Sequence, residues 1–143
     1  MFVMNRRLSM LVLVLALVPI QGAWSQAGRL QGAWLEEGTP CASVFVATRN
    51  AVAFRRPASA FAPAFIVSGR RLSTPLATCR LVGVSPTGDR QLVRLSCTTS
   101  VATDTARAIL ALAADGAIYR YHSLEGGIAS RYQRCTRDTL KAP

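Results

Sequence analysis

The sequence predicts an all-β fold, a small antiparallel up-and-down barrel of about eight strands, with a two-sheet β-sandwich as the alternative. Three observations lead to this prediction. Short β-rich runs alternate with Gly, Pro, Asn and Asp turns at spacings of roughly 8 to 12 residues, as in all-β meanders. The four cysteines are widely spaced and form no Cys-x-x-Cys motif. Closure into a barrel would also remove the exposed edges of a small sheet.

The N-terminus has the features of a secretory signal peptide. A short basic stretch precedes an apolar run over residues 10–18, which is shorter than the roughly 20 residues of a membrane-spanning helix. We expect cleavage after Ala27, with Ala23 as the second possible site. Residues 1–27 then form the signal, and residues 28–143 form one domain of 116 residues. The predicted product is periplasmic or secreted, without a transmembrane segment.

The candidate strands follow one another with short turns between them. Arg49-Asn50 favours a tight reversal, Gly126-Gly127 another, and residues 56–63, with two prolines, are the one irregular loop that we expect. The expected strands cover residues 32–36, 42–48, 51–55, 64–68, both arms of a hairpin over 79–97, 106–114, the stretch around Tyr119 and Tyr121, and 128–135.

The segment from Cys79 to Cys97 predicts a hairpin, because two β-rich runs flank Ser-Pro-Thr-Gly-Asp. Its centre of symmetry is Gly88. The expected cross-strand partners are Cys79 with Cys97, Leu81 with Leu95, and Gly83 with Val93. This register puts both thiols on one face at cross-strand distance, which predicts a disulfide between them.

The other two cysteines then pair by elimination. An even cysteine count in an oxidising compartment indicates a disulfide framework. With the hairpin pair assigned, Cys41 near the start of the domain is left for Cys135 near its end. We expect each bridge to stabilise the domain by roughly 3 to 5 kcal/mol, through the closure of its loop.

Residues 106–114 are ambiguous between strand and helix. Five alanines and two leucines favour a helix, with Thr103 or Asp104 as its cap. Asp115-Gly116, however, is the strongest hairpin dipeptide in the chain, and the residues after it alternate as a strand does. We therefore expect a strand that pairs with the strand around Tyr119.

The predicted domain is strongly basic. Loss of Arg6 and Arg7 with the signal leaves 15 basic against 7 acidic side chains, a net charge of +8. Such a surface favours an anionic partner, either a component of the envelope, such as lipid headgroups or a cell-wall polymer, or an acidic protein. Arginine that is simply scattered over a solvated surface is, however, the interpretation that we favour over a specific anionic partner. The candidate binding residues are the local concentrations Arg55, Arg56, Arg70, Arg71, Arg131 and Arg134, with Arg137 beside them.

The sequence offers no catalytic constellation. His122 is the only histidine, so any hydrolytic triad would need it. Glu36 and Glu37 are adjacent, so in a strand they point to opposite faces and cannot act as a carboxylate pair. Neither a phosphate-binding loop, a set of metal ligands nor a nucleic-acid module is recognisable. We predict a monomer that is not an enzyme, with no cofactor, no metal and no nucleic-acid partner.

Large side chains could line a ligand cavity inside the barrel. The candidates are Trp34, Phe45, Phe54, Phe65, Ile66 and the tyrosines. A barrel of eight strands, however, is only just wide enough for its own side chains. We therefore expect these residues to pack as a core, with Trp34 at the base of the barrel.

Leu30, Gly32, Trp34 and Cys41 form an L-x-G-x-W-x6-C pattern. It resembles the first strand of lipocalin-like barrels and is similar to small periplasmic inhibitors of secreted metalloproteases. The whole chain is similar to uncharacterised small exported β-barrel proteins of Gram-negative bacteria, which imply no activity. The inhibitors insert an N-terminal arm into the protease cleft, and cleavage after Ala27 leaves no such arm.

Three functions are compatible with these features. The first is a binding or inhibitory module that docks a periplasmic or secreted protein partner. The second is an envelope-associated protein that uses its arginine-rich surface on anionic lipid or cell-wall polymer. The third is a small lipocalin-like carrier of an apolar ligand.

Overall fold

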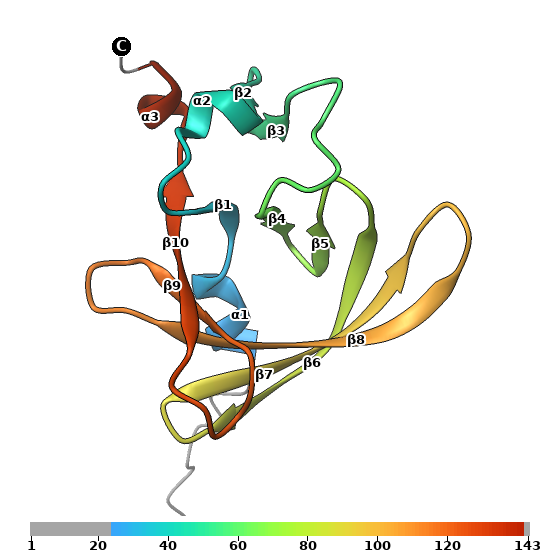
Figure 1. The fold of residues 1–143 in the computed structure, drawn as a ribbon, viewed down its shortest axis with the longest axis vertical. Coiled ribbons are helices and arrows are strands. Elements are labelled where there is room, and N and C mark those ends of the chain that lie inside the picture. Colours follow the sequence, from blue (N-terminus) through green and yellow to red (C-terminus); the bar gives the residue numbers. More distant parts are fainter. Residues whose placement is uncertain (1–23, 142–143) are drawn as a thin grey trace, which may run out of the picture.

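A computed structural model of the chain describes residues 24–141 (Figure 1). Within that range, eight of ten strands form a closed antiparallel barrel with the strand order β1-β10-β9-β8-β7-β6-β5-β4. Two disulfides join Cys41 to Cys135 and Cys79 to Cys97. The predicted fold class and both predicted disulfides are therefore confirmed, and the sandwich does not form. Most of the expected signal peptide, residues 1–23, lies outside the described residues.

The elements follow in chain order. They are α1 (Trp24–Arg29), β1 (Gly32–Glu36), α2 (Cys41–Val44), β2 (Phe45–Ala47), β3 (Val52–Phe54), β4 (Ala64–Ser68), β5 (Arg71–Ser73), β6 (Thr78–Thr87), β7 (Arg90–Thr98), β8 (Thr103–Leu112), β9 (Ile118–Tyr121), β10 (Ala129–Cys135) and α3 (Arg137–Lys141). From β4 to β10 each strand pairs with the next in sequence, and β1 closes the barrel between β10 and β4.

Strand β1 has a buried layer on each of its faces. Trp34 points into the barrel, where it belongs to the main hydrophobic cluster. Ala33 and Leu35 point outward, against a second cluster that includes Phe45 and the half-buried Phe54. This second cluster explains why three consecutive residues of β1 are buried, in place of the alternation of a strand with one solvated face.

The expected strands at 42–48 and 51–55 do not belong to the barrel, which corrects the sequence prediction. Residues Cys41–Val44 form a short helix, in which the Ser43 N–H donates to the Pro40 carbonyl, and proline suits the start of a helix. The remaining residues form the separate hairpin of β2 and β3. In Figure 1 this hairpin lies with α2 and α3 beyond one end of β1. The reversal at 49–50 does occur, because Thr48 N–H donates to the Ala51 carbonyl.

The base of the barrel is closed around Trp34, which is fully buried. Its Nε1–H donates to the Leu30 carbonyl at 2.8 Å, and the Arg134 guanidinium lies 4.3 Å from the ring centroid. Arg134 also donates to the Gln31 carbonyl. A Cβ on Gly32 would lie 2.7 Å from this guanidinium, so glycine leaves the space that the arginine occupies.

The hairpin of β6 and β7 has the predicted pairs Cys79 with Cys97 and Leu81 with Leu95. Beyond Leu81 the register shifts by one residue, so Gly83 pairs with Arg94 and not with Val93 as expected. A β-bulge causes the shift, and it leaves Gly88 and Asp89 as a two-residue turn. The inner pair of cysteines lies inside the barrel, in the main cluster.

Residues 106–114 are confirmed as a strand for most of their length. Strand β8 pairs with β7 through residues 103–110 and with β9 through residues 109–112. The Asp115-Gly116 turn joins β8 to β9, and Ala113 N–H donates to the Ala117 carbonyl across it. Pairing on both sides outweighs the helical propensity of the alanines.

Helix α1 contains the expected cleavage site. Ala27 is 7% exposed and Leu30 is 2% exposed, and both belong to the main cluster. Cleavage after Ala27 would therefore remove the buried side chain of Ala27 from the main cluster, whereas cleavage after Ala23 would retain the whole helix. The cleavage position stays a prediction.

A charge cluster joins the β8–β9 turn to strand β10. Arg131 forms ion pairs with both Glu37 and Asp115. The pKa of Asp115 lies below its ordinary value, first because the Ala117 N–H donates to its carboxylate and second because Arg131 is near. The ionised carboxylate therefore stabilises the fold, and this contribution is lost when acid protonates it.

This cluster predicts a specific acid sensitivity. A carboxylate with a lowered pKa contributes stability above its unfolded pKa and loses it as the pH falls through the folded value, here below about pH 4. Asp115→Asn is therefore expected to flatten the fall of the melting temperature between pH 5 and pH 2.5. Thermal melts across this range measure the effect, with Asp89→Asn as the charge-matched control. Parallel curves for Asp115→Asn and the wild type would contradict the assignment.

Candidate ligand-binding site

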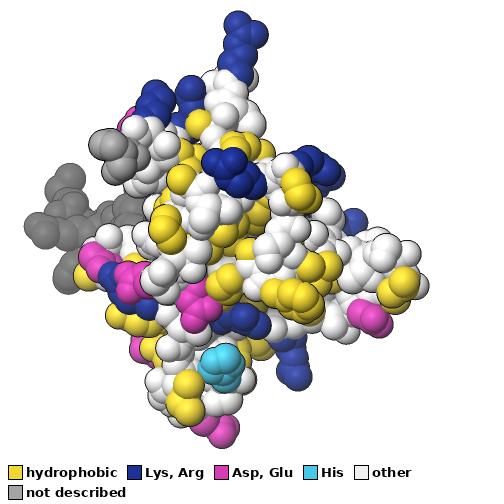
Figure 2. Space-filling view, turned by 45° about the horizontal axis from the view of Figure 1, so that its top comes forward, with side chains coloured by type: hydrophobic (Ala, Val, Ile, Leu, Met, Phe, Trp, Pro, Cys, Tyr) yellow, Lys and Arg dark blue, Asp and Glu magenta, His cyan; other side chains and the backbone are white. Residues whose placement is uncertain are grey.

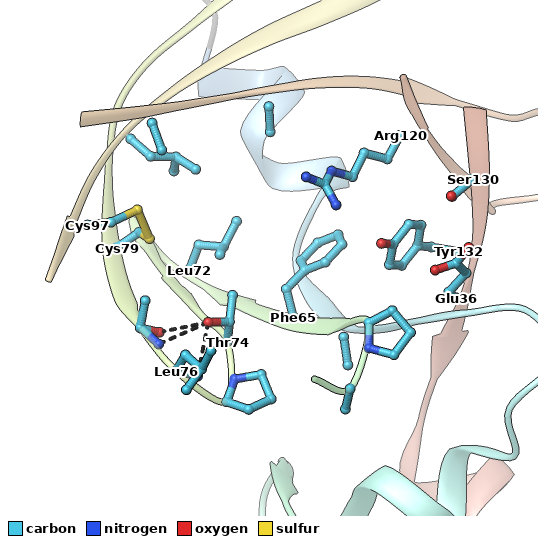
Figure 3. Close-up of a pocket in the computed structure, with 18 of the residues that line it drawn as sticks. Glu36, Phe65, Leu72, Thr74, Leu76, Cys79, Cys97, Arg120, Ser130 and Tyr132 are labelled. Carbon is cyan, nitrogen blue, oxygen red and sulfur yellow. Dashed lines mark hydrogen bonds between the residues drawn. A yellow bond between two sulfur atoms is a disulfide. The ribbon is translucent and has the colours of Figure 1, made fainter. Parts of the chain in front are cut away.

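The barrel contains a cavity of about 470 Å³ that opens to solvent, and all eight of its strands contribute to the wall (Figure 3). Its apolar residues include Phe65, Leu72, Leu95, Leu110 and the Cys79–Cys97 disulfide. The turn before β6 and the end of the loop before β4 surround its opening. A concave, mainly apolar space of this size is typical of a small-molecule site.

The open cavity differs from the packed interior that we expected. Trp34 does pack at the base, and Phe45, Phe54 and Ile66 lie outside the barrel in the second cluster. At the open end, however, the wall carries small side chains, namely Ala77, Ala106 and Ala108. These alanines fill little of the width of an eight-stranded barrel, so space remains.

Polar side chains lie along one side of the cavity. They are Glu36 from β1, Arg120 from β9, and Ser130 and Tyr132 from β10. Figure 3 shows Arg120 and Tyr132 extending into the same space as Phe65 and Leu72. The group therefore offers a cation, a carboxylate and two hydroxyls beside an apolar surface.

Arg120 is the unusual member of this wall. Strand β9 alternates so that Ile118 and Arg120 face inward, while Tyr119 and Tyr121 face outward and lie near Arg131 of β10 and Arg90 of β7, respectively. Within residues 24–141 no salt bridge or hydrogen bond involves the Arg120 side chain. Arg120 is solvent-exposed at the open end of the cavity, and a guanidinium without a protein partner at that place can pair with an anionic group of a ligand.

Among the described residues, the histidine beside the cavity has no catalytic partner in hydrogen-bond contact. His122 lies at its rim and is exposed, and its side chain has no hydrogen-bond partner among the described residues. A histidine that acts as general base needs a nucleophile within hydrogen-bond reach. In the described part of the chain, no cluster of three or more His, Cys, Asp or Glu could hold a metal ion.

The loops around the opening expose large apolar side chains. Phe61 is 91% exposed in the β3–β4 loop, and Leu76 is 60% exposed in the β5–β6 turn. Val101, at the tip of the β7–β8 hairpin, is 91% exposed. Both the β3–β4 loop and the β7–β8 hairpin project on one side of the barrel in Figure 1, and a shallow hollow links them across the β5–β6 turn.

The arginines singled out in the sequence do not form one site. Arg131 and Arg134 are held by the internal contacts described above. Arg55 donates from Nε to the Ala42 carbonyl at 2.7 Å. The other three lie in or beside the β3–β4 loop and β5, namely Arg56, Arg70 and Arg71. Figure 2 likewise shows Lys and Arg side chains spread over this face, with the single histidine in cyan.

Arg120 and Ser130 of the cavity wall were not among the sequence candidates, whereas Tyr132 was, as one of the tyrosines that could line a ligand cavity. The alternation of Arg120 with two tyrosines was visible, but that pattern alone suggests that the tyrosines face inward. The pairing of Ile118 with both Leu112 and Tyr132 sets the opposite orientation. Only the closed barrel reveals this pairing.

No protein-family model, curated protein or solved structure matches the chain. The class of protein is therefore defined by geometry: an eight-stranded antiparallel barrel, held by two disulfides, with one open cavity inside. Two disulfides are typical of proteins from an oxidising compartment. Among residues 24–141, no helix combines the length and the apolar character that a membrane crossing requires.

Proposed function

We propose that the protein is a non-enzymatic, exported binding module of the lipocalin-like carrier type, which holds a small amphipathic anion in its barrel. One observation carries the proposal. Arg120, a solvent-exposed residue without a protein partner in the described chain, brings a guanidinium to the wall of an open cavity whose other walls are mainly apolar. A neutral apolar ligand would leave this charge without a counter-ion, whereas an anionic head group would pair with it.

Each part of the ligand has a matching wall. An alkyl or aromatic tail would lie against Phe65, Leu72 and Leu95, and each 100 Å² of apolar surface that it buries contributes about 2.5 kcal/mol. The anionic group would accept hydrogen bonds from Arg120 and from the Tyr132 hydroxyl. Glu36 repels a second anion, so it favours a ligand with one charged end.

Substitution of Arg120 is expected to weaken anion binding selectively. Charge-assisted hydrogen bonds contribute about 1.5 to 3 kcal/mol, so Arg120→Gln should bind decanoate about tenfold or more weakly than the wild type. Binding of decanol should change little, because it carries no charge. Displacement of the fluorescent probe anilinonaphthalene sulfonate measures both affinities. Arg55→Gln, with the same loss of charge outside the cavity, is the matched control.

Two results would contradict this proposal. One is a wild-type protein that neither binds the probe nor releases it to decanoate. The other is an equal loss of decanoate affinity in Arg120→Gln and Arg55→Gln, since net charge and not the cavity would then determine binding.

Export belongs to the same proposal. The signal-like N-terminus and the two disulfides support a periplasmic or secreted protein. The resemblance to small exported β-barrel proteins of Gram-negative bacteria agrees with this location. A monomer is sufficient for the function, because a single barrel provides every wall of the cavity.

A second candidate is an inhibitor-type module that docks a protein partner. It is favoured by the exposed apolar side chains Phe61, Leu76 and Val101, which lie on neighbouring loops at one side of the barrel. Docking through such a packed interface would persist at high salt. Binding to secreted proteases at low and high ionic strength distinguishes this function from that of a carrier.

A further inference from the structure

The outer face of strands β5 to β8 carries a row of arginines. Arg71 on β5 lies directly opposite Arg80 on β6, and Arg94 on β7 lies directly opposite Arg107 on β8. Arg80 pairs in turn with Ser96, which is two residues from Arg94 on the same strand. The inward side chains of these strands, such as Leu72 and Leu95, fix the arginines on the outer surface.

Among the described residues, no acidic side chain forms a salt bridge with an arginine of the row. Like charges directly opposite one another destabilise an antiparallel pair. Nevertheless, none of the salt bridges formed within residues 24–141 involves an arginine of the row. The acidic side chains lie elsewhere: in the cavity, in turns, at the Arg131 cluster, on α3 and at Asp104, which pairs with the inward-facing Cys97. Two uncompensated arginine pairs indicate an anionic partner.

Hydroxyl groups surround part of the row. A shallow hollow on this face is lined by Arg70, Arg71 and Arg80 together with Ser68, Thr78, Ser96 and Thr98. Aromatic side chains, which would stack on nucleic-acid bases, are absent from its lining. Guanidinium groups beside hydroxyls suit sugar rings that carry charged groups.

We propose that this arginine row binds a linear anionic polysaccharide, with successive acidic groups paired to successive arginines. The row crosses four strands, which is about 14 Å at the usual strand spacing. The outside of a barrel is convex, so a flexible polymer can follow the row, whereas a flat membrane would touch only part of it. Arg71, Arg80 and Arg94 are not among the lining residues of the cavity, and only Arg107 also borders it, so the proposed polysaccharide site does not depend on the proposed ligand.

Gly83 contributes to the row by the space that it leaves. A Cβ on Gly83 would lie 2.3 Å from a guanidinium nitrogen of Arg94, so the Arg94 side chain lies across β6 over this glycine. There it donates to the Ser85 hydroxyl at 3.2 Å. Gly83→Ala would therefore displace the end of a flexible side chain, with little effect on stability, while moving one charge of the row.

Binding to dextran sulfate tests the proposal, with neutral dextran as the reference polymer. The double variant Arg80→Gln/Arg94→Gln is compared with Arg55→Gln/Arg56→Gln, which loses the same charge from a different loop. We expect the row variant to bind at least tenfold more weakly at 50 mM salt. Its slope of log affinity against log salt should be smaller by about two, one for each lost ion contact. Gly83→Ala should weaken binding with an unchanged melting temperature.

Three results would overturn the proposal. The first is a wild type that does not bind dextran sulfate in preference to dextran, and the second is an equal loss of affinity in both double variants. The third is that anionic phospholipid vesicles compete with dextran sulfate for the wild type and bind the row variant more weakly as well. Binding of decanoate by the row variant should stay at the wild-type level. A loss there would indicate damage to the barrel, and Gly83→Ala would then provide the test.

Discussion

Trp34→Ala is expected to cause the largest loss of stability of any single substitution in the barrel. The side chain is fully buried, and its ring lies 6.4 Å from that of Phe65. Its removal leaves a void, orphans the Leu30 carbonyl and uncovers the Arg134 guanidinium. Substitutions of this kind cost about 3 to 5 kcal/mol. The free energy of unfolding of a small domain is roughly 5 to 15 kcal/mol in total. We therefore expect a large fraction of the variant molecules to be unfolded.

Denaturant unfolding of the wild type, Trp34→Ala and Trp34→Phe measures this effect. The phenylalanine variant keeps most of the apolar volume and loses the indole N–H, so its loss of unfolding free energy should be much smaller than that of Trp34→Ala. The fluorescence of Trp34 is lost in both variants, and circular dichroism is therefore the common signal. A stability of Trp34→Ala within about 1 kcal/mol of the wild type would mean that Trp34 does not close the base of the barrel.

The second large effect is expected for the disulfide between Cys41 and Cys135. This bridge joins residues 94 positions apart, whereas Cys79 and Cys97 are 18 positions apart. On the loop-entropy account, loss of the long bridge costs about 4.7 kcal/mol and loss of the short one about 3.2 kcal/mol. The long bridge also holds α2 to the end of β10, beside the second cluster.

Paired alanine variants test this order. Cys41→Ala/Cys135→Ala should have a lower denaturant midpoint than Cys79→Ala/Cys97→Ala. The second pair should also alter binding of the naphthalene probe, because its sulfur atoms line the cavity, whereas the first pair lies outside it. A reversed order of midpoints would show that strain or packing, and not loop closure, determines what each bridge contributes.

Much of the barrel could be predicted because local patterns and long-range pairing agree. The turn at Asp115-Gly116, the alternation after it and the hairpin between two cysteines each specify one antiparallel pair. Residues 42–48 show where this agreement ends. Their β-rich composition fits a barrel strand. The disulfide at Cys41 and the second cluster on β1, however, hold them against the outer face of the barrel.

The cavity could not be predicted from residue types. Its space comes from the small side chains Ala77, Ala106 and Ala108 in the wall, and its cation comes from the orientation of β9. The arginine row could not be predicted from residue types either, because it depends on how the strands pair. Arg80 and Arg94 belong to one predicted hairpin, but the bulge beyond Leu81 sets their relative positions, and Arg107 joins them only through the β7–β8 register.

The measurement that tests the ligand-carrier account most directly is native mass spectrometry of the protein recovered from its export compartment. The wild type should carry a small anionic amphiphile that dissociates on denaturation. Ala108→Trp, which fills the cavity from β8, should be recovered as the bare chain and should not bind decanoate. A wild type without any such adduct and without affinity for decanoate, or an adduct that Ala108→Trp retains, would contradict the account.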